Sequence, residues 1–146
     1  MSTIRTVVVD DEKPARLRLL ELLQREADVE VVGVASDGEE AVEMVRRLTP
    51  DVLFLDVQMP GLDGFGVLEA LGPEQLPVTI FVTAYDKYAI QAFDAHAIDY
   101  LLKPYGDQRF EDAIRRARKY LNTERARQPG GEEVAAARAR QSVANY

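Results

Sequence analysis

The sequence predicts an α/β fold in which a five-stranded parallel sheet is covered by helices on both faces. Five short apolar runs alternate along the chain with amphipathic stretches of helical periodicity. Runs that are apolar throughout, rather than alternately, are typical of parallel strands buried on both faces. The helical stretches between them are the crossover connections that a parallel sheet requires.

The first half of the chain is predicted to supply three strands and two helices. The strands cover Ile4–Val9, Val29–Ala35 and Val52–Leu55. A helix begins near Pro14, since proline suits the first helical turn, and continues with leucines at helical spacing. A second helix begins after Ser36-Asp37-Gly38 and ends at Thr49-Pro50, because the residue before a proline disfavours helical geometry.

The second half is predicted to supply two strands and three helices. The elements are a helix over Phe65–Leu71, a strand over Val78–Val82, a helix over Lys87–Phe93, a strand over Ile98–Leu102 and a helix that includes Phe110 to Leu121. The loop Met59–Gly64 precedes the first of these helices, and Gly72-Pro73 ends it. We therefore predict one domain over residues 1–122, followed by a linker or tail over residues 123–146.

The composition excludes several classes of protein. The chain has no cysteine, so disulfides, thiolate metal sites and cysteine nucleophiles are excluded. The net charge is -7, and residues 1–106 carry 9 basic and 19 acidic residues, a balance that repels nucleic-acid phosphate. The apolar runs are too short to span a membrane, and no signal peptide is recognisable. We expect a cytoplasmic protein that contacts neither membrane nor, through this domain, DNA.

Polar residues follow or end four of the predicted strands. They are Asp10 and Asp11, Asp56, Thr83 and Lys103. Ligands of open parallel sheets bind beyond the carboxyl ends of the strands, so these side chains should converge there. Three carboxylates repel one another unless a cation joins them, and oxygen ligands suit Mg²⁺. A carboxylate nucleophile, Mg²⁺, an ammonium and a hydroxyl are the parts that phosphoryl transfer to aspartate needs.

Four blocks of sequence resemble the receiver domains of two-component response regulators, over about residues 4–122. They are Val-Val-Val-Asp10-Asp11-Glu12, Leu-Phe-Leu-Asp56-Val-Gln-Met-Pro60-Gly61-Leu-Asp-Gly64, Phe-Val-Thr83-Ala84 and Asp99-Tyr100-Leu-Leu-Lys103-Pro104. The stretches 84–93 and 97–104 are similar to the subgroup attached to LytTR-type (LytR/AlgR) DNA-binding domains. The resemblance implies a flavodoxin-like, doubly wound sheet with strand order 2-1-3-4-5 and five helices.

The resemblance implies that Asp56 accepts a phosphoryl group from the phosphohistidine of a sensor histidine kinase. Mg²⁺ would be bound by Asp10, Asp11 and Asp56, together with the backbone carbonyl of Gln58. Such a domain promotes its own phosphorylation and dephosphorylation, so we do not class it as an enzyme acting on separate substrates.

The resemblance also implies how the modification is transmitted. Thr83 and Lys103 would contact the phosphoryl oxygens, and the Lys103-Pro104 peptide would be cis. Thr83 would move inward and let Tyr100 turn, which changes the face formed by the fourth helix, fifth strand and fifth helix. That face would form a homodimer. Gln58 and Tyr85 flank the acceptor and would tune hydrolysis, with the bulk of Tyr85 limiting access of water.

Two other functions stay open at this point. A Mg²⁺-dependent hydrolase with an aspartyl intermediate usually carries Asp-x-Asp and a cap domain, whereas this chain has Asp56-Val57-Gln58 and no cap. A receiver-like scaffold that only binds partners would have a damaged site, whereas every site position is intact here. Simpler interpretations also exist for single residues: Asp10-Asp11 as a solvated turn, and His96 as a surface residue.

The length bears on the role in transcription. Residues 123–146 are too few for a DNA-binding domain, so the chain is either an excised receiver or a stand-alone receiver with a tail. We favour the excised receiver because the resemblance to the LytTR-type subgroup is close and a linker-like composition, Gln128 to Glu132, starts where expected. DNA binding would then belong to a C-terminal domain that is missing from this chain.

Overall fold

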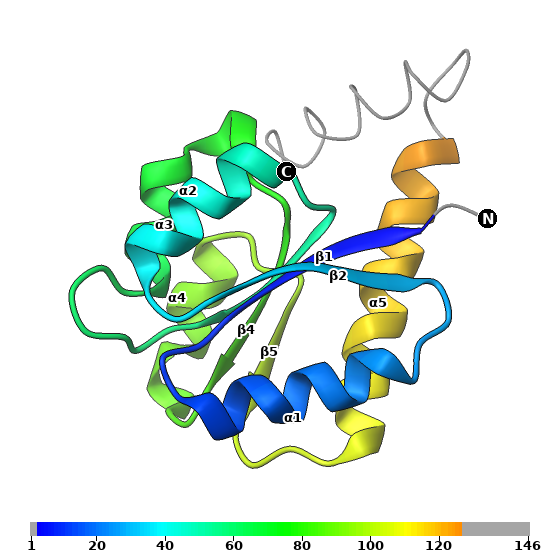
Figure 1. Ribbon diagram of the computed structural model, residues 1–146, viewed down its shortest axis with the longest axis horizontal. Helices are drawn as coiled ribbons and strands as arrows, with labels where there is room; N and C mark the ends of the chain where they lie inside the picture. The colour runs from blue at the N-terminus through cyan, green and yellow to red at the C-terminus, as the bar shows by residue number, and fades with distance from the viewer. Residues whose placement is uncertain (1–2, 127–146) are drawn as a thin grey trace.

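The centre of the structure is a five-stranded parallel sheet, seen in a computed structural model that describes residues 3–126 (Figure 1). The strand order is β2-β1-β3-β4-β5, which confirms the predicted fold class and order. Each pair of neighbouring strands is parallel. The strands are β1 (Ile4–Val9), β2 (Val29–Ala35), β3 (Val52–Asp56), β4 (Val78–Thr83) and β5 (Asp99–Leu102).

Helices cover both faces of the sheet (Figure 1). One face carries α1 (Lys13–Gln24) and α5 (Asp107–Ala126). The other face carries α2 (Gly38–Leu48), α3 (Gly64–Leu71) and α4 (Ala89–Asp94). Two short 3-10 turns, η1 (Pro73–Gln75) and η2 (Asp86–Tyr88), flank β4. Within residues 3–126, no helix combines the length and the apolarity that crossing a bilayer requires.

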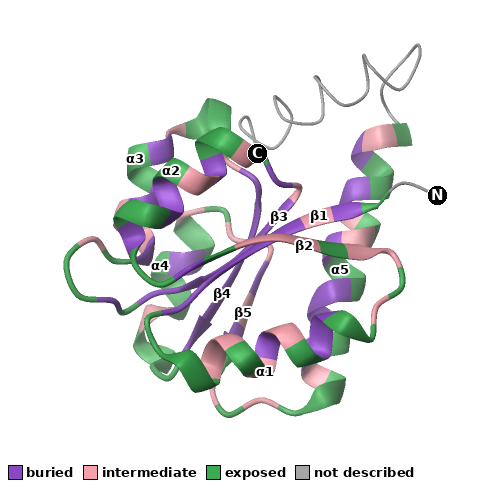
Figure 2. Cartoon of the chain, in the orientation of Figure 1, coloured by how far each residue is buried: buried purple, intermediate pink, exposed green. Residues whose placement is uncertain are grey.

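The core lies in two layers, one on each face of the sheet (Figure 2). Every residue of β3 and β4 is buried, which explains why most of their residues are apolar and why polar residues do not alternate with them. Towards α1 and α5, the rings of Phe54 and Phe110 stack with centroids 6.0 Å apart. On the opposite face, Phe65 lies against Phe81 with centroids 4.9 Å apart. Packing of the two layers sets the positions of the strand ends, and therefore the positions of the polar residues at those ends.

Aspartate caps begin two of the helices that flank the carboxyl end of the sheet. The side chain of Asp37 accepts a hydrogen bond from the Glu40 backbone N–H at 2.8 Å, at the start of α2. Asp63 does the same with Gly66 at 2.8 Å, at the start of α3. Such a cap contributes about 1 kcal/mol to helix stability. These caps explain why both helices begin within about one residue of where the sequence predicts.

Several boundaries differ from the prediction. β3 ends at Asp56, β4 ends at Thr83 and α3 begins at Gly64, each one residue from the predicted position. The expected helix over Lys87–Phe93 is split into η2 and a short α4, and no side chain caps α4 at its start. β5 begins at Asp99, one residue later than expected. α5 continues beyond Leu121 to Ala126, and Arg125 in its last turn pairs with Asp51 at 3.6 Å. The rest of the predicted linker lies outside the described residues.

Candidate functional site

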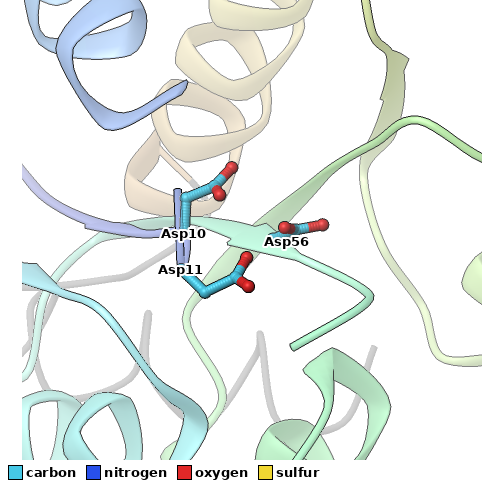
Figure 3. A group of neighbouring side chains, drawn as sticks. All are labelled: Asp10, Asp11 and Asp56. Atoms are coloured by element: carbon cyan, nitrogen blue, oxygen red, sulfur yellow. The ribbon is translucent and has the colours of Figure 1, made fainter. Parts of the chain in front are cut away.

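Three aspartates meet at the carboxyl end of the sheet, and we call this group the carboxylate rim: Asp10, Asp11 and Asp56 (Figure 3). Asp10 and Asp11 follow β1, and Asp56 is the last residue of β3. One carboxylate oxygen from each residue lies within 4.8 Å of the others. Asp10 and Asp56 are buried, whereas Asp11 is exposed. A rim of this kind can hold one divalent cation through oxygen ligands while leaving it open to solvent on one side.

Lys103 brings the fourth charge to the carboxylate rim from the end of β5. Its Nζ lies 2.8 Å from Oδ2 of Asp10 and 3.7 Å from Oδ2 of Asp56. The Lys103-Pro104 peptide is cis, as the resemblance implied. The backbone N–H of Lys103 donates to the carbonyl of Thr83 at 2.7 Å, which ties this segment to the end of β4. The ends of β1, β3, β4 and β5 therefore converge as the sequence predicts.

Local hydrogen bonds orient the buried carboxylates. Asp10 accepts a hydrogen bond from the backbone N–H of Glu12 at 2.9 Å, and Asp56 accepts one from the backbone N–H of Gln58 at 3.3 Å. Arg16 donates from its guanidinium to the backbone carbonyl of Asp10 at 2.8 Å. Each carboxylate is thus held by the loop that follows its own strand, with its remaining oxygen directed at Lys103.

Gly64 is required by the close approach of α3 to the end of β3. A Cβ atom at this position would lie 2.5 Å from the carbonyl oxygen of Asp56 and 3.0 Å from the Cα of Val57. The backbone N–H of Gly64 donates to the carbonyl of Val57 at 2.7 Å, which closes the loop between β3 and α3. The glycine in the predicted loop therefore serves packing beside Asp56.

Thr83 and Tyr100, the predicted switch pair, meet at the backbone of Tyr85. Thr83 is fully buried, and its hydroxyl oxygen accepts a hydrogen bond from the backbone N–H of Tyr85 at 3.4 Å. The half-buried Tyr100 donates from its hydroxyl to the backbone carbonyl of Tyr85. Burial is the main cause that raises the pKa of Tyr100 above its ordinary value. The two residues are thus linked through one peptide segment.

The sequence matches the response regulator receiver domain family over residues 6–115. This chain belongs to that family. Transcriptional regulatory protein BtsR of Escherichia coli K12 is 47% identical over 116 residues, which cover 80% of this chain and 48% of BtsR. A response regulatory protein of Yersinia pestis is 48% identical over 118 residues, or 81% of this chain and 50% of the relative. The receiver thus spans about half the length of these curated relatives.

Solved receiver structures share the fold. The REC domain of AraT, a response regulator from Geobacillus stearothermophilus, superposes with a TM-score of 0.76 at 36% identity, covering 84% of this chain and 98% of that domain. The signal receiver domain of the response regulator NarL from Mycobacterium tuberculosis superposes with a TM-score of 0.74 at 33% identity, covering 82% and 98%. This receiver therefore belongs to a two-component response regulator.

The electrostatics of the receiver favour a cation at the carboxylate rim. Burial, and then the charge of Asp10, raise the pKa of Asp56 to about 7, although Lys103 opposes them. Burial also disfavours the charge of Lys103, but its hydrogen bond to Asp10 and the nearby Asp56 carboxylate outweigh this, so the pKa of Lys103 is raised. The single ammonium of Lys103 therefore does not neutralise the negative charge of the three carboxylates, and a divalent cation would supply the missing positive charge.

The structure adds residues that sequence reasoning did not single out. Glu12 places a carboxylate oxygen 3.9 Å from Nζ of Lys103, and Arg16 supports the Asp10 backbone. Tyr88 accepts a hydrogen bond from the Gln58 side chain at 3.2 Å. The position of Glu12 next to Asp10-Asp11 could have marked it as a candidate site residue. Nothing in the sequence indicates the contact between Tyr88 and Gln58. His96 is exposed with a φ of 64°, which agrees with its interpretation as a surface residue.

Proposed function

We propose that this receiver takes a phosphoryl group from the phosphohistidine of a sensor histidine kinase onto Asp56. The observation that carries the proposal is the carboxylate rim, with a buried acceptor and the Lys103 ammonium 3.7 Å from it. In the step, an Asp56 oxygen forms a bond to phosphorus while the donor's phosphorus–nitrogen bond breaks, and the imidazole leaves with the electron pair. Lys103 and the Thr83 hydroxyl would stabilise the charge on the phosphoryl oxygens.

The residues present fit a magnesium ion. Asp10, Asp11 and Asp56 supply carboxylate oxygens, and Gln58, whose backbone carbonyl would join them, lies two residues after Asp56 in the loop that follows β3. Hard oxygen ligands without any sulfur or imidazole favour Mg²⁺ over softer metals. The bound ion would supply charge neutralisation for the incoming phosphoryl group, and Asp10 and Lys103 would orient and balance the acceptor.

We propose that phosphorylation acts on a switch face, defined as α4, β5 and α5, and that a second copy of this chain binds there. Two apolar side chains of α4, Ile90 and Phe93, are 79% and 80% exposed. The same face carries exposed basic residues of α5, such as Arg115, and acidic residues near α4, such as Asp94. A face that carries both signs of charge and exposed apolar side chains suits a two-fold dimer. Basic residues of one copy can then contact acidic residues of the other, and the symmetry repeats each contact in reverse.

The wider role follows from the relatives and the sequence resemblance. We propose that the receiver belongs to a LytTR-type transcription regulator, because BtsR is named a transcriptional regulatory protein and extends to about twice the matched length. DNA contact would then lie in a domain outside this chain. The expectations that the domain is not an enzyme acting on separate substrates, and that it works in the cytoplasm, stay predictions.

Acetyl phosphate and Mg²⁺ test the proposal. The purified domain should gain the mass of one phosphoryl group, mapped to Asp56, and the gain should vanish without Mg²⁺ and in Asp56→Asn. Sustained phosphate release from varied phosphate monoesters would instead identify a hydrolase. Complete lack of reaction would identify a binding scaffold. Either result would overturn the phosphoacceptor assignment.

Tyr85 is proposed to lengthen the phosphorylated lifetime by limiting the access of water. Its side chain is 45% exposed beside the switch residues, and its ring lies 5.4 Å from the Lys87 ammonium. Tyr85→Ala should shorten the half-life of the adduct formed with acetyl phosphate. Equal decay rates in the wild type and in this variant would refute the role.

A further inference from the structure

One hydrogen bond beside the acceptor joins two loops that are 30 residues apart in the chain. The side-chain Nε2 of Gln58 donates to the hydroxyl oxygen of Tyr88 at 3.2 Å. Gln58 lies two residues after Asp56 in the loop that follows β3, and Tyr88 ends the η2 turn that follows β4. The Gln58 carboxamide is therefore tied to the η2 turn.

The position of the Tyr88 hydroxyl is set by aromatic packing. The ring of Tyr88 lies 6.0 Å from the ring of Phe65, which itself packs on buried Phe81 of β4. On its other side the ring meets Tyr85 edge-on at 6.1 Å, and the Lys87 ammonium lies 5.2 Å from its centroid. Contacts of these kinds have preferred geometries, so they fix the ring and with it the hydroxyl.

The side-chain carboxamide of Gln58, if free to move, could promote hydrolysis of the acyl phosphate at Asp56. The Gln58 backbone N–H donates to the Asp56 carboxylate at 3.3 Å, so the residue sits beside the acceptor. A carboxamide offers a donor and an acceptor, and an unrestrained glutamine next to a phosphoryl group can orient an attacking water. Hydrolysis would join the water oxygen to phosphorus and break the bond to Asp56. The carboxylate would keep the electron pair, and the released phosphate would carry the water's oxygen and protons.

We propose that Tyr88 is a positioning residue that holds the Gln58 carboxamide away from the attacking water and so prolongs the life of phospho-Asp56. The proposal rests on the phosphoacceptor function above and adds a residue to its control. The Tyr88 hydroxyl acts through Gln58 alone, and the packing of the Tyr88 ring on Phe65 supplies the restraint.

Three variants test this restraint by the decay of the adduct formed with acetyl phosphate and Mg²⁺. Tyr88→Phe keeps the ring but removes the hydroxyl, and should speed decay about 3–10-fold while the rate of adduct formation stays within about twofold, an order-of-magnitude expectation for freeing one water-orienting group. Gln58→Met removes the carboxamide and sets the reference decay rate for a chain without it. The double variant should decay like Gln58→Met, because removing the Tyr88 hydroxyl has no effect once there is no carboxamide for it to restrain. Tyr120→Phe, a tyrosine of α5 far along the chain, is the matched control.

Several outcomes would overturn the proposal. Wild-type decay in Tyr88→Phe would show that the hydroxyl restrains nothing. Fast decay that persists in the double variant would show that Tyr88 does not act through Gln58. Markedly slow decay in Gln58→Met alone would mean that the carboxamide already orients water in the wild type. A wild type that forms no adduct would overturn the phosphoacceptor function too, whereas normal adduct formation with an unaltered Tyr88→Phe lifetime would overturn this inference alone.

Discussion

The buried carboxylate of Asp56 should make the protein less stable at neutral pH than a neutral side chain there would. Only 6% of the Asp56 side chain is exposed, and burial, then the nearby Asp10, raises its pKa to about 7. The unfolded chain loses this proton near the ordinary aspartate pKa of about 4, so the folded state binds more protons between pH 4 and 7. The free energy of unfolding should therefore fall as the pH rises through that window.

Asp56→Asn should remove this pH dependence. In the absence of Mg²⁺ at pH 8, the variant should be more stable than the wild type by on the order of 2–4 kcal/mol, and the difference should vanish near pH 4. Urea unfolding at several pH values measures it. Glu43→Gln, which neutralises an exposed carboxylate of α2, is the control and should show no such trend. A constant difference between wild type and Asp56→Asn at all pH values would contradict the prediction.

At the scale of elements, α5 is fixed to the far end of the sheet by a cluster of ion pairs. Arg118 donates from Nε and NH2 to both carboxylate oxygens of Asp28, at 2.7 and 2.8 Å, and from NH2 to Glu26 at 3.1 Å. Both acids lie in the loop between α1 and β2. The hydrogen bond from Arg118 is the main cause that lowers the pKa of Asp28, and burial opposes it.

Arg118→Ala should destabilise the receiver by about 1–3 kcal/mol at pH 7, because it breaks hydrogen bonds between charged, partly buried groups. The lowered pKa of Asp28 means that this contribution is present above pH 4 and is lost as the pH falls through the pKa of the folded state. Chemical unfolding at pH 7 and pH 3 measures it. Arg115→Ala on the same helix, whose side chain is 66% exposed in its pair with Asp112, should cost less than about 1 kcal/mol. Equal losses for the two variants would refute the assignment.

At the scale of the whole molecule, charge and apolar exposure are unevenly distributed. The body of the chain is acidic, whereas residues 107–128 carry 7 basic and 4 acidic residues, and these lie largely on α5. The most exposed apolar side chains among residues 3–126 are Ile90 and Phe93 of α4. The basic helix and the apolar pair thus belong to the same switch face, which is where we propose that a second copy binds.

Beryllofluoride, which mimics the phosphoryl group, should increase the dimer fraction in sedimentation. Phe93→Ser should weaken the induced dimer about tenfold or more, because burial of one phenylalanine contributes about 1.5–3 kcal/mol. Leu17→Ser on α1, whose leucine is 53% exposed, is the control and should leave the dimer unchanged. An unaltered monomer fraction after full modification, or equal effects of the two substitutions, would count against the switch face as the dimer contact.

Much of the fold could be predicted because local patterns and the global arrangement agree. The apolar runs of β3 and β4 predicted buried parallel strands, and the structure buries each of their residues. Proline and glycine punctuation located the helix ends, and the caps Asp37 and Asp63 confirm two of the starts. Prediction failed at η2, where the helix expected over Lys87–Phe93 begins as a 3-10 turn. The rings of Tyr85 and Tyr88 meet edge-on there, and local periodicity carries no information about such contacts.

The sequence by itself determined which residues stand at the strand ends, because the order of apolar runs dictates where Asp10, Asp56 and Lys103 follow them. Only the tertiary structure decided how these charges interact. The 2.8 Å contact of Lys103 with Asp10, the raised pKa of Asp56 and the bond from Gln58 to Tyr88 all join distant segments. Burial and through-space distance set such energies, and both exist only once the sheet has brought its strand ends together.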